Sequence, residues 1–400
     1  MRMARAYQRE GAGRGPVVRS GTGRALGDRS CARGPVVRSR RRRVDQRWAA
    51  DRLGAVNATA VNTTPLPGPS HTHVRPAGRV FSGVQPSGLP HIGNYLGAFR
   101  NYIAMQDSHD AIYCIVDYHA LTSTHDGELV RRNTYEMALG LLSLGLDPAK
   151  AVLFRQSDRP EHAELAYLLS TVVPVSWVER TPSFKDKKRD QPDDVNHALL
   201  TYPVLQTADI AIYHGRYVPV GRDQAAHLEL AREILRAWNS RYGEFFIEPE
   251  AVFTDSPVVK GTDGAQKMSK STGNVVEIFA EEATIRKQIM SMVTDRQRIL
   301  RTDPGRPEVC NVCQLHRFFG ADYESIWEGE RTARTGCVDT KRLLGDRVLD
   351  FFAEARERRR EFEARPGYVE DVLRAGAERL APMASETMRE VRARMGLGGT

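Results

Sequence analysis

The sequence has no uninterrupted apolar run long enough to cross a membrane, although 41% of its 400 residues are hydrophobic. A transmembrane helix needs about 20 such residues in succession, so we expect a soluble protein without a membrane-spanning segment. Cysteine is scarce as well: the five cysteines form no framework typical of secreted domains, and any pairing leaves one over. This composition favours a reducing cytosol, and hence a cytoplasmic protein.

The sequence also lacks a complete set of closely spaced metal ligands. Cys310, Cys313 and Cys337 are the cysteines of the C-terminal half. A zinc or iron–sulfur site needs four ligands with suitable spacing, and a second Cys-x-x-Cys pair would need cysteine in place of Thr340. His316 could complete a set of four, but we expect buried or free thiols and no bound metal.

Lysine is rare, with nine residues against 49 arginines. Three of the nine, Lys185, Lys187 and Lys188, lie in one polar stretch, and Lys267 and Lys270 lie in another. Loops that face phosphate groups are one interpretation of this clustering, and solvated loops are the other. In the first stretch Lys187 is the better candidate by its position.

Acidic residues are nearly absent from the N-terminal fifth of the chain. Residues 1–79 hold 17 arginines, no lysine and 4 acidic residues, a net charge of +13, whereas the other residues carry −5. Residues 1–76 have almost no apolar periodicity, so they cannot bury enough surface to fold alone. We expect a disordered basic leader there, with nucleic-acid phosphate binding or an organelle transit peptide as alternatives.

The stretch around which we expect the fold to be organised is residues 80–97. An apolar run ends in a loop rich in glycine and proline, and apolar residues then recur at helical spacing from Tyr95. Such a strand-loop-helix turn points backbone N–H groups and the positive end of a helix dipole at a ligand, which suits phosphate. His91 and Asn94 add side-chain donors, although an ordinary capped turn is the simpler interpretation of this stretch alone.

Buried strands and amphipathic helices alternate through the next part of the chain. Residues 111–117 and 151–155 indicate buried parallel strands, and residues 128–146 and 161–172 indicate helices. This alternation is typical of an α/β fold with a Rossmann-like parallel sheet. Beyond residue 277 the chain indicates a C-terminal α-helical domain. The helices expected there cover residues 281–293, 315–319, 340–364 and 368–395.

A helix expected at residues 199–213 carries the polar groups best suited to specificity. Pro203 suits the first turn of a helix, and Tyr202, Gln206 and Asp209 then fall on one face. A carboxylate among apolar residues needs a partner. Asp209 could bond to a neighbouring hydroxyl or accept a hydrogen bond from a ligand.

A second motif, Lys267-Met268-Ser269-Lys270-Ser271, narrows these alternatives. With average residue usage this pentapeptide occurs by chance in about one in ten thousand chains of this size. Together the two motifs resemble the HIGH and KMSKS signatures of class I aminoacyl-tRNA synthetases. The form Gln85-Pro86-Ser87-Gly88 followed by His91-Ile92-Gly93-Asn94 resembles the tryptophanyl-tRNA synthetase branch, and the resemblance extends from about Arg79 to the C-terminus.

The resemblance implies roles for individual residues. The residues implied in catalysis are His91, Asn94, Lys267 and Lys270. The residues implied in ATP binding are Gln85, Pro86, Ser87, Gly93, Asn94, Lys187, Gly221, Arg222, Asp223, Gln224, Lys267, Met268, Ser269, Lys270 and Ser271. The residues implied in tryptophan binding are Phe81, Gly83, Gln85, His119, Tyr202, Gln206 and Asp209. Asp209 falls where the family carries the carboxylate that accepts the indole N–H.

Two positions depart from the family pattern. Arg222 stands where an acidic residue is common, in the Gly-x-Asp-Gln element that holds the nucleotide. Gln206 stands where some members carry methionine, which raises the alternative of a sub-branch with different inhibitor sensitivity.

The resemblance implies the reaction of a tryptophan–tRNA ligase. Tryptophan and ATP, with Mg²⁺, give tryptophanyl-adenylate and pyrophosphate, and the tryptophanyl group is then transferred to tRNA(Trp). The implied organisation is a leader at 1–76, a catalytic domain at 77–276 and an anticodon-recognition domain at 277–400, in a homodimer. The alternatives are a tyrosyl-tRNA synthetase, which shares the fold and both signatures, and an auxiliary tryptophan-binding paralogue with a non-translational or inhibitor-resistance role.

Overall fold

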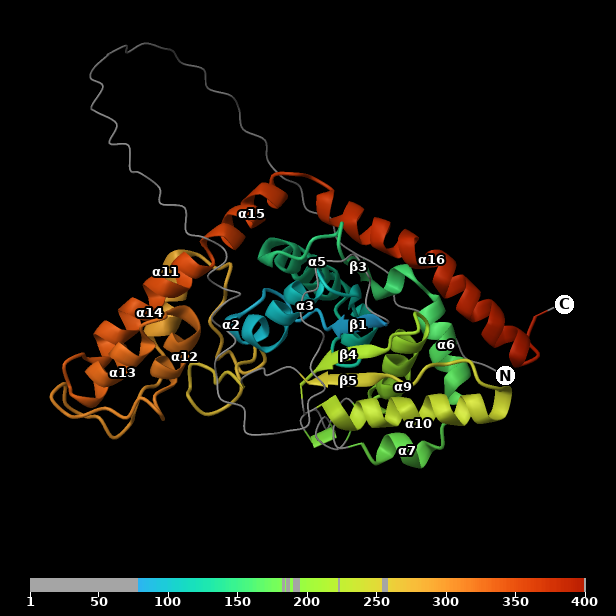
Figure 1. Ribbon diagram of the computed structural model, residues 1–400, viewed down its shortest axis with the longest axis horizontal. Helices are drawn as coiled ribbons and strands as arrows, with labels where there is room; N and C mark the ends of the chain where they lie inside the picture. Colours follow the sequence, from blue (N-terminus) through green and yellow to red (C-terminus); the bar gives the residue numbers. More distant parts are fainter. Residues whose placement is uncertain are drawn as a thin grey trace, which may run out of the picture. The chain divides into compact units, whose positions relative to one another are not determined.

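The fold is built on a parallel β-sheet with helices on both faces (Figure 1). The computed structural model describes residues 78–181, 184, 188–189, 195–221, 224–253 and 258–398. The leader expected at residues 1–76 lies outside these residues. The strands of the sheet are β1 (Arg79–Val84), β2 (Asp110–Ile115), β3 (Val152–Arg155), β4 (Tyr217–Val220) and β5 (Glu250–Phe253). They are all parallel and lie in the order β3-β2-β1-β4-β5, which confirms the predicted Rossmann-like sheet.

The helices between and after the strands follow the predicted α/β and C-terminal α-helical pattern. Those up to β5 are α2 (Ile92–Asn94), the π-helical turn η1 (Tyr95–Phe99), α3 (Arg100–Met105), α4 (Asp117–Ala120), α5 (Gly127–Leu144), the 3-10 turn η2 (Gln156–Asp158), α6 (Glu161–Ser170), α7 (Val175–Glu179), α9 (His197–Ala211) and α10 (Ala225–Tyr242). Those after β5 are α11 (Glu282–Met290), α12 (Asn311–Phe319), α13 (Tyr323–Arg331), α14 (Cys337–Phe351), α15 (Ala353–Glu363) and α16 (Tyr368–Arg394). Among the described residues no helix is long and apolar enough to span a bilayer.

Two details of the predicted helices are wrong. The single helix expected over 340–364 is interrupted between α14 and α15 at Phe352, where the backbone (φ −96°, ψ 8°) leaves the helical region. The ring of Phe352 is buried and lies edge-on to Tyr95 at 5.0 Å. Pro203 lies in the interior of α9 rather than in its first turn, because the side chain of Asn196 caps the helix earlier by accepting the N–H of Leu199 at 2.9 Å.

Both faces of the sheet are buried, which explains the nearly continuous apolar run of β2. Successive side chains of a strand point to opposite faces. Tyr113 and Ile115 accordingly join one buried cluster, while Ile112 and Cys114 join another. The apolar sequence of β2 therefore supplies both cores.

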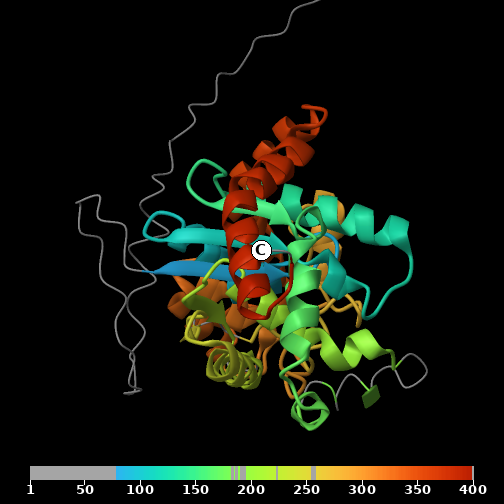
Figure 2. The same cartoon turned by 90° about the vertical axis from the view of Figure 1, so that its right-hand side faces the viewer.

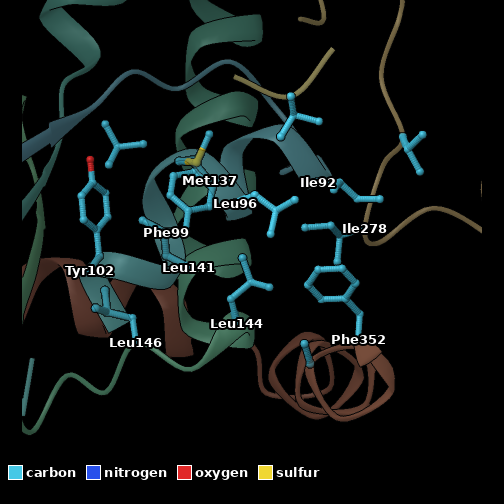
Figure 3. Packing of buried hydrophobic residues seen from close by; sticks show 14 of the residues in the cluster. Ile92, Leu96, Phe99, Tyr102, Met137, Leu141, Leu144, Leu146, Ile278 and Phe352 are labelled. Atoms are coloured by element: carbon cyan, nitrogen blue, oxygen red, sulfur yellow. The ribbon is translucent and has the colours of Figure 1, made fainter. Parts of the chain in front are cut away.

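The first cluster joins the helix after β1 to the C-terminal helices. Figure 3 shows Ile278 between Ile92 and Phe352, with Leu96 and Leu141 in the same cluster. The segment after residue 276 thereby packs directly on the turn that follows β1.

The long helix α16 covers the side of the sheet at β3 (Figures 1 and 2). Its buried residues recur at helical spacing from Val369 to Val391. The helix approaches closely because Gly376 has no side chain, and a Cβ there would lie 2.0 Å from the carbonyl oxygen of Leu153. Close packing at this point depends on glycine.

Replacing Gly376 with alanine should therefore push α16 away from β3. Overpacking of this kind typically destabilises a protein by about 1–3 kcal/mol, and urea unfolding measures the loss. Gly127→Ala is the matched control, because a Cβ at this exposed first residue of α5 meets no atom within 4 Å. Equal midpoints for the two variants would contradict the close contact between α16 and β3.

Candidate active site

A cavity of about 370 Å³ opens beside the carboxyl-terminal parts of β1 and β4. The chain order of the strands reverses between these two neighbours, and open α/β sheets bind ligands at such a point. Residues of η1, α3, α9 and α10 and of the turn after β2 complete the wall. The residues predicted to bind tryptophan all line this cavity: Phe81, Gly83, Gln85, His119, Tyr202, Gln206 and Asp209.

Asp209 is the buried charge of this cavity, with 2% of its surface exposed. Oδ1 accepts hydrogen bonds from Nε2 of Gln156 at 2.6 Å and Nδ1 of His162 at 2.7 Å. Oδ2 lies 2.9 Å from Nε2 of His119. Burial by itself raises the pKa of Asp209, but the hydrogen bonds from His119 and His162 outweigh burial and lower this pKa to about 2. The carboxylate is therefore ionised at neutral pH.

The sequence prediction missed two of these partners, Gln156 and His162. Gln156 directly follows β3, and His162 lies in the first turn of α6. The second nitrogen of His162 lies 2.8 Å from the hydroxyl of Tyr213. Since Nδ1 donates to Asp209, Nε2 accepts the Tyr213 proton in the neutral ring. One signal was available in the sequence, because polar residues at the carboxyl end of a buried parallel strand point to the ligand edge.

A second hydrogen-bonded chain runs along another wall of the cavity. The hydroxyl of Tyr202 lies 2.8 Å from Nε2 of His227, and Nδ1 of His227 lies 2.9 Å from Oε1 of Gln224. All three residues line the cavity. Gln224, predicted among the ATP-binding residues, therefore lies in the same cavity as the predicted tryptophan-binding residues, and so does Gly221.

The signature loop, residues 85–94, forms the entrance to α2. His91 and Asn94 make a reciprocal capping box there: Nδ1 of His91 accepts the N–H of Asn94 at 3.2 Å, and Oδ1 of Asn94 accepts the N–H of His91 at 3.1 Å. With Nδ1 as an acceptor, the neutral ring carries its proton on Nε2. Each side chain thus supplies a cap and keeps a second nitrogen, Nε2 or Nδ2, that can donate.

The lysine loop, residues 267–271, is held by Asn274. Oδ1 of Asn274 accepts the N–H of Ser269 at 2.7 Å, while its Nδ2 donates to Asp263 at 2.7 Å. Met268 is buried in the first apolar cluster. The loop backbone is therefore anchored at its centre, while Lys267 and Ser271 are exposed.

Lys270 brings the lysine loop against the signature loop. If Gly88 carried a Cβ atom, this atom would lie only 2.8 Å from Nζ of Lys270. The backbone of Gly88 also has a φ of +90°, a conformation that favours glycine. Neither Lys267 nor Lys270 forms an ion pair within the described part of the chain. Burial lowers the pKa of Lys270. Burial and the charges of Lys270 and Lys267 lower the pKa of His91 to about 4, so this imidazole is neutral at pH 7.

The predicted site residues thus form two groups. The predicted tryptophan-binding residues, with Gly221 and Gln224, line the cavity, and the two loops bring His91, Asn94 and Lys270 together. Gln85 belongs to both groups, because it lines the cavity and begins the signature loop. Three predicted ATP-binding residues lie outside the described residues: Lys187, Arg222 and Asp223.

Cys310 and Cys313 lie together at the start of α12, whereas Cys337 is the first residue of α14. Cys310 is the N-terminal cap of this helix, and its Sγ accepts the N–H of Cys313 at 3.4 Å. His316, considered above as a fourth ligand, is directed elsewhere, since its Nε2 lies 3.0 Å from the carbonyl oxygen of Thr340. Over the described ranges no group of three or more His, Cys, Asp or Glu side chains is arranged to hold a metal ion.

Comparisons with known proteins identify relatives over most of the chain. A family model described as tRNA synthetases class I (W and Y) matches residues 75–353. The tryptophan–tRNA ligases of Deinococcus radiodurans and Thermotoga maritima are each 42% identical to this chain over 80% of its length, and the matches cover 98% and 99% of those proteins.

Solved structures also include similar tryptophanyl-tRNA synthetases. The crystal structure of tryptophanyl-tRNA synthetase from Campylobacter jejuni, complexed with ADP and tryptophan, has a TM-score of 0.74 and 39% identity, and the match covers 80% of this chain and 100% of that one. A tyrosyl-tRNA synthetase from Archaeoglobus fulgidus is 20% identical with a TM-score of 0.57, and the match covers 70% of this chain and 90% of that one. That second likeness shows a shared fold alone.

The neutral state of His91 gives a pH dependence that can be measured. Because its folded pKa of about 4 lies below the ordinary value of 6.5, the unfolded chain binds a proton more readily. Stability from this residue is present above pH 6.5 and is lost as the pH falls toward 4. Relative to His91→Asn, which keeps a capping side chain, the wild type should lose on the order of 3 kcal/mol between pH 7 and 4. Urea unfolding at both pH values tests this, and a constant difference would contradict it.

Proposed function

Since this chain belongs to the class I tRNA synthetases for tryptophan and tyrosine, in their tryptophan–tRNA ligase branch, we propose that it joins L-tryptophan to tRNA(Trp) with ATP. The observation that carries the proposal is the ionised Asp209 in the wall of a cavity at the reversal point of the sheet. The residues of this cavity wall give it an aromatic and polar lining suited to an amino acid.

Asp209 is suited to select the indole ring. A carboxylate offers about four acceptor positions, and the described residues place two donors on Oδ1 and one on Oδ2. The remaining position on Oδ2 matches a single N–H donor, such as that of indole. A phenylalanine ring would leave this buried acceptor without a partner, which penalises the wrong substrate more than shape does.

The activation step then needs alignment rather than a general base. The carboxylate of tryptophan is ionised at neutral pH and can attack the α-phosphate of ATP directly. The signature loop offers Nε2 of His91 and Nδ2 of Asn94 to the phosphates. Lys267 and Lys270 supply positive charge to the pyrophosphate as it leaves, and we assign the largest share of catalysis to this charge stabilisation.

Mg²⁺ enters this proposal as part of the substrate. The described residues contain no cluster of three or more ligating side chains, and Mg²⁺ in nucleotide sites is commonly held by substrate phosphates with one or two carboxylates. We therefore assign Mg²⁺ to the MgATP complex and its charge to the phosphates.

The proposal includes the remaining partners. Residues 277–400 form the region that contacts the tRNA anticodon, with 77–276 as the catalytic domain. The proposal also includes a homodimer, and the exposed side chains of Tyr167 on α6 and Val175 on α7, of which 72% and 62% are accessible, are candidates for its interface. The cytoplasm is the compartment that fits free thiols.

ATP–pyrophosphate exchange with each amino acid tests the proposed function. Exchange should occur with tryptophan and not with tyrosine, because the proposal places the indole N–H, and not a phenol hydroxyl, at the remaining acceptor position of Asp209. Exchange with tyrosine would move the chain to the sister family. No exchange with any amino acid would leave a tryptophan-binding module in place of the enzyme.

Lys270→Ala should reduce the rate of adenylate formation by on the order of a hundredfold or more. Tryptophan affinity should change little, because Lys270 is not in the wall of the cavity. Single-turnover kinetics and tryptophan titration measure the two effects separately. Lys287→Ala, at an exposed position on α11, is the matched control. A loss of tryptophan affinity with an unchanged rate would show that the role assigned to Lys270 is wrong.

A further inference from the structure

We propose that His227 is a positioning residue that fixes the donor and acceptor character of two substrate-binding side chains. It does so through a hydrogen-bonded relay, Tyr202–His227–Gln224, that joins helix α9 to the start of α10. This inference rests on the proposed function for the identity of the substrates, but the relay itself rests on the described geometry.

The direction of the hydrogen bonds follows from their partners. Oε1 of Gln224 has no proton to give, so Nδ1 of His227, 2.9 Å away, must donate to it. A neutral imidazole with its proton on Nδ1 has an acceptor at Nε2. The Tyr202 hydroxyl, 2.8 Å from Nε2, therefore donates its proton to His227. One tautomer thus determines the orientation of both neighbouring groups.

The surroundings of His227 make this tautomer persistent. The ring is only 6% exposed, so water competes weakly for its nitrogens. The ring of Tyr202 lies edge-on to it at 5.5 Å, which limits rotation of both rings. Gln224 occupies the N-terminal cap position of α10 without making a side-chain cap, and its carboxamide bonds His227 instead.

The relay makes Tyr202 a hydrogen-bond acceptor toward a ligand and Gln224 a hydrogen-bond donor. Because the proton of Tyr202 points to His227, the oxygen of Tyr202 meets a ligand as an acceptor, which suits the α-ammonium group of an amino acid. Because Oε1 of Gln224 is held by His227, the carboxamide meets a ligand through its N–H groups, which suit carboxylate or phosphate oxygens. His227 therefore orders one side chain for the ammonium group of the amino acid and one for carboxylate or phosphate oxygens.

Kinetic variants separate the two halves of the relay. His227→Phe removes both bonds and should lower kcat/KM for tryptophan by roughly a hundredfold, while His227→Asn keeps a donor near Nδ1 and should lose only about tenfold. His227→Gln keeps an acceptor near Nε2 and tests the other half. His197→Asn, at the exposed first residue of α9, is the control expected to match the wild type.

A double-mutant cycle tests the coupling between Tyr202 and His227. Tyr202→Phe should cost less in the His227→Asn background than in the wild type, because the bond between the two side chains is already absent. Equal losses in both backgrounds would overturn the relay. A lower melting temperature of the His227 variants with unchanged kcat and KM would also overturn it, because it would indicate a purely structural role.

Nitrogen-15 NMR of the histidines provides a test that does not depend on activity. The wild type contains 11 histidines, and the signal of His227 is the one missing from His227→Asn. Near pH 8 it should show a protonated Nδ1 and an unprotonated Nε2. The opposite tautomer would refute the relay even if tryptophan exchange is normal. The expected tautomer in a chain without exchange would retain the relay and refute the proposed function instead.

Discussion

A carboxylate stays charged in an apolar interior only when donors surround it, and Asp209 obtains its donors from three separate parts of the chain. His119 comes from the turn after β2, Gln156 from the turn after β3 and His162 from α6, while Asp209 itself lies on α9. The strands and helices on this side of the sheet must all be in place before the charge is stable. The selectivity that we propose for Asp209 and correct folding around the cavity therefore depend on the same hydrogen bonds.

The signature loop and the lysine loop are stabilised in a different way. Their backbones are fixed by reciprocal hydrogen bonds, through the capping box of His91 and Asn94 and through Asn274 behind the lysine loop. The lysine side chains lie outside these bonds and have no carboxylate partner among the described residues. A fixed backbone with uncompensated ammonium groups attracts an anion and lets the side chains adjust as its charge shifts. Burial, together with the charges of Lys270 and Lys267, lowers the pKa of the neighbouring His91 and keeps this imidazole neutral at pH 7.

The sequence predicted the parts of this structure that depend on local spacing. Tyr202, Gln206 and Asp209 fall on one helical face, and the cavity contains all three. The partners Gln156, His162 and His227 were missed, because each meets its neighbour across elements that are distant in the sequence or on another helix. The helical spacing of apolar residues also continues through Phe352, so the sequence predicts one helix where the structure has two. The interruption there depends on packing against Tyr95, which no local pattern reveals.

The packing of α16 on β3 has a consequence for synthesis on the ribosome. β3 is an edge strand, and α16 is translated more than 200 residues after it, since β3 ends at Arg155 and α16 begins at Tyr368. Every strand of the sheet is complete before its covering helix emerges. Until α16 has been translated it cannot cover the β3 edge, and an uncovered edge strand can pair with other chains. Quality control of this protein should therefore depend on whether translation reaches α16.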